Sequence, residues 1–112
     1  MTIQQVREAT AYWADKLRLH DWQITVQFAS NAIMDKQEAV GLAMWVAEER
    51  TAVVLLRRTQ DDLERTLVHE LCHVVMGGHR PQTSQDAYDV AEERAINSLS
   101  DALVSFHRHL AR

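Results

Sequence analysis

The pattern that most constrains this chain is a pair of histidines four residues apart, His69 and His73, with Glu70 directly after the first. On an α-helix, residues four apart lie one turn apart on the same face, so both imidazoles can be directed at one point. A Zn²⁺ site requires that arrangement. Glu70 lies about 100° around the helix from His69, close enough to act on a water molecule held there. The pattern therefore predicts a helix that carries part of a metal site.

The flanking residues predict that this helix is buried on most sides. Asp61 followed by Glu64 has the form of a capping box at the helix start, and Gly77 with Gly78 is placed to end it. Two lines of apolar residues recur at helical spacing, namely Leu63, Leu67, Leu71 and Val74, and Val68, Cys72 and Val75. Ionisable groups are costly to bury without a partner. This cost favours a bound metal over two histidines that only form hydrogen bonds to the backbone.

Length and composition restrict the class of protein. The chain has 112 residues, enough for one modest core, so we expect residues 1–112 to form a single domain. A net charge of −4 without a long run of either sign argues against a broad nucleic-acid-binding surface. No apolar run approaches membrane-spanning length, and residues 1–17 lack the pattern of a signal peptide. One cysteine excludes an internal disulfide and fits a reducing cytosol, so we expect a cytoplasmic protein without a membrane partner.

Hydrophobic periodicity predicts an α+β fold, with an N-terminal helix, a short three-stranded, mainly antiparallel sheet, the helix of the histidine pair and a long C-terminal helix. The first and last helices are expected at residues 2–19 and 84–110, and the strands at residues 22–28, 39–47 and 51–56. The last two strands would form a hairpin. The third strand is apolar throughout, as is typical of a strand buried on both faces. Residues 29–38 have the composition of a polar loop.

Several side chains within these elements indicate local features. Thr2 and Gln5 have the form of a capping box at the start of the first helix. Gly41, inside the second strand, indicates a bulge or a close approach of another part of the protein. Trp45 in the same strand is expected in the core, with the lining of a substrate cleft as the alternative. The last helix carries an apolar stripe of Ile96, Leu99, Leu103, Phe106 and Leu110.

A catalytic zinc ion usually has three protein ligands and one open position. The tandem carboxylates Glu92 and Glu93, near the start of the last helix, are the best candidates for the third ligand. Glu92 continues the apolar stripe, so the helical wheel directs it at the core. Glu93 lies beside the stripe and one turn before Asn97, whose amide is placed to orient a ligating imidazole. Periodicity therefore favours Glu92, whereas the spacing to Asn97 favours Glu93.

Other polar residues are weaker candidates for the site. Cys72 points to the other side of His69 and is expected in the core, and His79 would reach the site only if its loop folded back. Tyr88 and Arg80 are weak candidates for a second oxyanion donor. Surface or structural roles are expected for His20, Asp86, Asp89, His107 and His109.

The chain resembles the gluzincin metallopeptidases in residues 69–73 (HELCH) and 93–97 (ERAIN). Its expected layout is similar, over most of the chain, to that of small phage and bacterial gluzincin-like proteins of the ImmA/IrrE type. Residues 21–24 (DWQI) and the tandem glutamates are softer points of similarity. The resemblance implies a zincin-like fold with Zn²⁺ bound by His69, His73 and Glu93, and Glu70 as the general base. It thus selects Glu93 over Glu92.

These features together predict a zinc-dependent peptidase that acts on a peptide or protein substrate. Glu70 would accept a proton from the attacking water and pass it to the leaving amine. The strand at residues 39–47, if it is an edge strand, would pair with an extended substrate. The alternative is a non-catalytic, metal-stabilised domain that binds a partner protein. Glu70 favours the peptidase, because a purely structural metal site needs no base.

Overall fold

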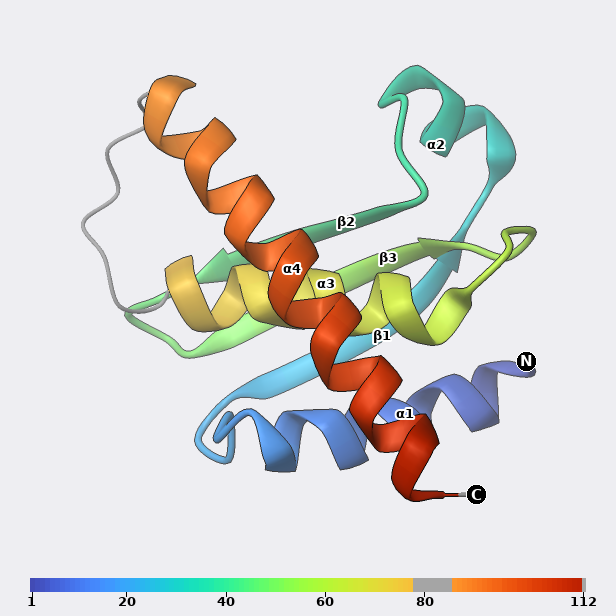
Figure 1. Cartoon of the computed structure of the whole chain (residues 1–112). Coiled ribbons are helices and arrows are strands. Elements are labelled where there is room, and N and C mark those ends of the chain that lie inside the picture. The colour runs from blue at the N-terminus through green and yellow to red at the C-terminus, as the bar shows by residue number, and fades with distance from the viewer. Residues whose placement is uncertain (78–85, 112) are drawn as a thin grey trace.

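The computed structural model describes residues 1–77 and 86–111, and it confirms the predicted α+β fold (Figure 1). The described elements are, in chain order, α1 (Ile3–Lys16), β1 (Gln23–Ala29), α2 (Asn31–Lys36), β2 (Gly41–Val46), β3 (Thr51–Arg57), α3 (Leu63–Gly77) and α4 (Asp86–Leu110). α3 packs against β2 and β3, and α4 crosses α3 on the side away from the sheet (Figure 1). None of the described helices combines the length and the hydrophobicity needed to span a membrane.

The three strands form one sheet in the order β1-β3-β2. β2 and β3 form the predicted antiparallel hairpin, in which Gly41 is paired with Leu56. β1 runs parallel to β3, so the sheet is mixed where we expected a mainly antiparallel one. The cause is the connection through α2, which reverses the chain direction, so that β2 runs opposite to β1. The hairpin turn then reverses the chain again and places β3 between β1 and β2, parallel to β1. As a result β2 is an edge strand.

Residues 29–38, expected to form a polar loop, contain the short helix α2. The Ser30 hydroxyl caps this helix and accepts a hydrogen bond from the backbone N–H of Ile33 at 3.2 Å. Met34 is fully buried and anchors the helix to the rest of the molecule. A six-residue helix with one buried side chain shows no hydrophobic periodicity, which is why its sequence resembles a loop.

The core lies between the sheet and the helices α1 and α3. Along β3, buried and half-buried residues alternate, and the buried ones are Ala52, Val54 and Leu56. Val53 and Leu55 point to the opposite face and are half-buried, so burial on both faces of this strand, as the sequence suggested, is only partly realised. α1 begins at the predicted capping box, in which Thr2 and Gln5 satisfy each other's backbone N–H groups.

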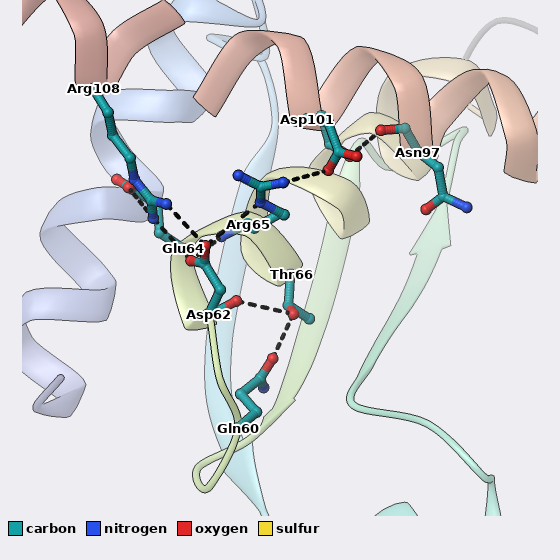
Figure 2. Close-up of polar contacts among 9 residues, drawn as sticks. Gln60, Asp62, Glu64, Arg65, Thr66, Asn97, Asp101 and Arg108 are labelled. Carbon is teal, nitrogen blue, oxygen red and sulfur yellow. Dashed lines mark hydrogen bonds and ion pairs between the residues drawn. The ribbon is translucent and has the colours of Figure 1, made fainter. Parts of the chain in front are cut away.

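The first turn of α3 is capped one residue later than we predicted. Asp62, and not Asp61, accepts a hydrogen bond from the backbone N–H of Arg65, at 3.1 Å. Two nitrogens of the Arg108 guanidinium donate to the Asp62 carboxylate at 2.8 and 2.9 Å (Figure 2). These hydrogen bonds, more than any other contact, hold the pKa of Asp62 at about 2.

Glu64, which we expected to complete the capping box, joins α3 to its two neighbouring helices instead. It accepts hydrogen bonds from the indole N–H of Trp13 in α1, at 3.2 Å, and from Arg108 in α4, at 3.2 Å. α1 and α4 also meet directly, where the Tyr12 hydroxyl lies 3.1 Å from Nδ1 of His107. His107 thus has the structural role expected for it, and His109 is exposed.

The predicted apolar stripe of α4 is wrong for three of its five residues. Leu99, Phe106 and Leu110 are exposed by 51%, 64% and 67%. The residues of α4 that are buried against α3 follow each other at intervals of four, and they are Glu92, Ile96, Ser100 and Val104. A serine can occupy this line because its hydroxyl donates to the backbone carbonyl of Ile96 at 2.8 Å.

The Asp62 contacts give a prediction about acid stability. The pKa of Asp62 is lowered from 3.8 to about 2, so its contribution is complete above pH 4 and is lost as the pH falls through 2. Asp62→Asn should lower the free energy of unfolding at neutral pH by about 1 kcal/mol, since the group is partly exposed. The difference from the wild type should shrink between pH 4 and pH 2, as measured by denaturant unfolding. Asp61→Asn is the matched control. An equal loss of unfolding free energy in that variant would show that Asp61 contributes to the cap as much as Asp62 does.

Candidate metal centre

α3 places His69 and His73 on one face, as the four-residue spacing predicted. Their ring centroids lie 5.0 Å apart, and the ring planes are inclined by 65°. Apart from Glu70, the other residues of α3 from Leu67 onward are apolar, and Leu67, Val68 and Leu71 pack into the core. The two imidazoles are therefore directed away from the sheet, toward α4, and are largely shielded from solvent.

α4 brings Glu93 to both histidines. One carboxylate oxygen of Glu93 lies 2.8 Å from Nε2 of His69, and the other lies 2.9 Å from Nε2 of His73. One potential ligand atom from each of the three residues can be chosen so that all lie within 4.8 Å of one another. Two imidazole nitrogens and a carboxylate oxygen at these separations are a donor set that a divalent metal ion can use.

The neighbouring Glu92 lies on the opposite side of the His73 ring. Its side chain is buried, and one carboxylate oxygen is 3.5 Å from Nδ1 of His73. The two competing arguments from the sequence therefore each describe one glutamate, because Glu92 points into the core and Glu93 lies between the histidines. Asn97 lies in the groove wall with His69, as its spacing from Glu93 suggested, and its side chain opposes the fall in the His69 pKa that burial causes. Histidines that bind metals usually have their second nitrogen held by a neighbouring polar group.

Glu70 is the third ionisable residue of the motif, and it is 7% exposed. One of its carboxylate oxygens lies 4.0 Å from Nε2 of His69. Burial, reinforced by the charge of Glu93, raises the pKa of Glu70 to about 7. Burial also lowers the pKa of His69, against the opposing effect of Glu93, and so favours the neutral imidazole that can bind a metal.

Gly41, at the start of β2, lies against α3 beside Glu70. A Cβ atom at this position would lie 2.5 Å from Cγ2 of Thr66 and 3.1 Å from Cγ of Glu70. No glycine among the described residues has a positive φ, so Gly41 is required for space and not for backbone conformation. The close approach that the sequence suggested is thus confirmed, and it determines how near the edge strand lies to Glu70.

Gln60 fixes the position of β2 against α3, and the sequence analysis did not identify this role. Its amide nitrogen donates to the backbone carbonyls of Val40, at 3.0 Å, and Arg57, at 2.6 Å. Its amide oxygen accepts a short hydrogen bond from the Thr66 hydroxyl (Figure 2). A glutamine in a connection gives no sequence signal for such a contact, because its three partners lie on three different segments.

A groove of about 430 Å³ opens beside these residues, between residues 38–41, α3 and α4. His69, Glu70 and Glu93 form part of its wall. Further along, Arg65 of α3 and Asp101 of α4 pair across the groove at 2.9 Å (Figure 2). A second groove of about 360 Å³ lies between α1 and β1, but Arg7 is the only ionisable residue that lines it. The first groove therefore combines space for a ligand with reactive groups.

Three further candidates, Cys72, Trp45 and His20, lie outside this site. Burial raises the pKa of Cys72 to about 11, and the residue packs in the core. The Trp45 indole packs so closely on Gly77 that a Cβ there would overlap it, which agrees with a core role. His20 is exposed beside Asp15. His79 and Arg80 lie outside the described residues, as do the side chains of Asp86, Tyr88 and Asp89.

Comparisons with protein-family models, curated proteins and solved structures found no match for this chain. The chemistry of the site therefore has to be argued from its own side chains. Those side chains are the cluster of His69, His73 and Glu93 and the buried carboxylate of Glu70. Of these four residues, His69, Glu70 and Glu93 line the groove.

The contact at Gly41 gives a prediction about stability. Gly41→Ala should lower the free energy of unfolding by about 1–3 kcal/mol, because the added methyl group overlaps the Thr66 side chain. Thr66→Ser removes the methyl group closest to the new Cβ and keeps the hydroxyl that bonds to Gln60. The double variant should therefore recover much of the loss in denaturant unfolding. If the changes in unfolding free energy of the two single variants simply add in the double variant, steric overlap with Thr66 does not cause the loss in Gly41→Ala.

Proposed function

We propose that this chain is a zinc-dependent peptidase in which His69, His73 and Glu93 bind the metal and Glu70 is the general base. The observation that carries the proposal is the convergence of the His69 and His73 Nε2 atoms on the Glu93 carboxylate, beside a groove whose wall includes His69 and Glu93. Three such donors are the usual protein ligands of a catalytic zinc site, which keeps a further position open. The donor set suits Zn²⁺ and would also accept other divalent ions.

The surrounding residues support a catalytic role for this cluster. When bound, Zn²⁺ would supply Lewis acidity that polarises a carbonyl group and lowers the pKa of water. Glu92 lies 3.5 Å from Nδ1 of His73 and so helps to hold this ring with its Nε2 atom toward Glu93. Glu70 would accept a proton from the attacking water and deliver it to the leaving amine. Burial raises the pKa of Glu70 above the ordinary carboxylate range, which makes it a stronger base for the first transfer.

The edge strand provides a way to bind an extended peptide. The Val40 carbonyl accepts a hydrogen bond from the backbone N–H of Arg57 at 2.9 Å, so this residue faces β3. Along an antiparallel strand, the backbone N–H and C=O groups of successive residues point alternately toward the neighbouring strand and away from it. The backbone groups of Gly41 and Ala43 are therefore directed toward the open edge of the sheet. A peptide added at this edge would enter the groove beside Glu70.

Glu70 also favours a hydrolase over a metal-stabilised domain that only binds a partner. Burial of a carboxylate is costly, and its cost is visible here as a pKa raised to about 7. A structural zinc site is usually closed by a fourth protein ligand, and Glu70 is not part of the cluster whose ligand atoms converge, so its buried carboxylate serves no such closure. General-base catalysis does require such a group.

Metal binding tests the ligand assignment. The wild type should bind one Zn²⁺ per chain, whereas His73→Ala and Glu93→Gln should weaken binding by well over tenfold, since each removes a ligand. Glu92→Gln should keep the stoichiometry and weaken binding by about tenfold at most, because it only holds the His73 ring. Competition with a chromophoric chelator measures the affinities, and Glu38→Gln, in the wall of the same groove but outside the ligand cluster, is the control. Loss of zinc in Glu92→Gln with retention in Glu93→Gln would reverse the assignment.

Hydrolysis tests the role of Glu70. Zinc-loaded wild type should cleave members of a mixed set of internally quenched peptides, and Glu70→Gln should reduce the rate by about 10²–10⁴-fold, because the amide cannot accept the proton. The variant should bind zinc as the wild type does, which separates loss of the base from loss of the metal. Full activity in Glu70→Gln would rule out this mechanism, and zinc-loaded wild type that cleaves no peptide would rule out the peptidase.

A further inference from the structure

The outer side of α4 carries an exposed line of apolar residues, here named the α4 stripe. It consists of Ala91, Ala95, Leu99, Ala102, Phe106 and Leu110. All six are exposed, and Leu99, Phe106 and Leu110 by more than half. The stripe extends over about 30 Å of helix at 1.5 Å per residue, and α4 covers α3 on the side away from the sheet (Figure 1). An uncharged helix face of this length, directed at solvent, marks an interaction surface.

The order of large and small residues in the α4 stripe is self-complementary. Its first two members are alanines, its last two are large, and Leu99 and Ala102 occupy the centre in the reverse order. In an antiparallel pair of α4 helices related by a two-fold axis between Leu99 and Ala102, every large side chain faces an alanine. Phe106 then faces Ala95 of the second copy, Leu99 faces Ala102, and Leu110 faces Ala91. We propose that a second copy of this chain covers the α4 stripe in this antiparallel arrangement.

Charge and geometry support the second copy as the occupant. Antiparallel pairing places His109, which is exposed at the C-terminal end of α4, level with the N-terminal end of the second copy's α4. It also opposes the two helix dipoles. A parallel pair would instead set Phe106 against Phe106 and leave the alanines facing each other. The contact is confined to one helix from each copy, so we expect a weak dimer that dissociates in the micromolar range.

The pairing leaves the candidate metal centre accessible. Asn97 and Asp101, which line the groove, each lie about 200° around α4 from Leu99. A dimer through the α4 stripe therefore carries two open grooves on opposite flanks of the paired helices. The inference is independent of the proposed peptidase activity, because it rests on residues that contact neither the histidines nor the groove.

Sedimentation velocity over the micromolar concentration range tests the pairing. The wild type should shift from one chain to two as its concentration rises. Ala102→Leu should weaken the dimer at least tenfold, because it places leucine against Leu99 of the second copy. The exchange Leu99→Ala with Ala102→Leu restores one large and one small residue at each contact, so it should recover most of the affinity. Both positions are exposed, and thermal unfolding of each variant checks that the fold is kept.

The same series distinguishes specific pairing from general hydrophobic adhesion. Ala102→Leu adds apolar surface, so a merely adhesive stripe would associate more strongly in this variant, and that result would overturn the proposal. A wild type that stays monomeric at every concentration would also overturn it. Flotation with phosphatidylcholine and phosphatidylserine vesicles is the companion measurement, since a monomer that binds them would assign the α4 stripe to a membrane surface.

Discussion

The candidate metal centre depends on how α4 crosses α3. Charged contacts hold this crossing along its whole length. Asp62 and Arg108 join the helices at the start of α3, Arg65 and Asp101 pair one turn further on, and Glu93 meets both histidines beyond them. Between these contacts α4 buries a narrow line against α3. A shift of either helix by one residue would separate the Glu93 carboxylate from the imidazoles, so the site and the crossing are one structural feature.

This dependence links metal binding to stability. Glu70 and Glu92 are almost completely buried beside the histidines, and burial of carboxylates is unfavourable unless charge or hydrogen bonds compensate for it. A divalent ion at the site would oppose the repulsion between Glu70 and Glu93 that helps to raise the Glu70 pKa. Because its ligands come from two helices, such an ion would stabilise their crossing as well as polarise a substrate.

Local sequence patterns correctly predicted the features that depend on residues close together in the chain or on the space that one residue occupies. The four-residue spacing placed His69 and His73 together, and a glycine inside a strand indicated the close contact at Gly41. The true cap of α3 was missed, because Asp61 and Asp62 are equally suitable caps and the choice is made by Arg108, which is distant in sequence. The role of Gln60 was missed for the same reason. One of its bonds goes to the carbonyl of Val40, twenty residues away, which only the folded sheet brings within reach.

The error in the stripe of α4 has a different origin. On the helical wheel of α4, apolar residues lie along two lines about 60° apart. A search for one amphipathic stripe combines the two lines into a single face. One line, through Ile96, packs on α3 together with Ser100 and Glu92, whereas the other, through Leu99 and Phe106, is exposed. Stability alone would place the larger apolar side chains inside and the serine and the glutamate outside. The inverted arrangement is understandable if the inner line is adapted to hold the histidines and the outer line is adapted to a partner, so that neither is optimised for the monomer's core.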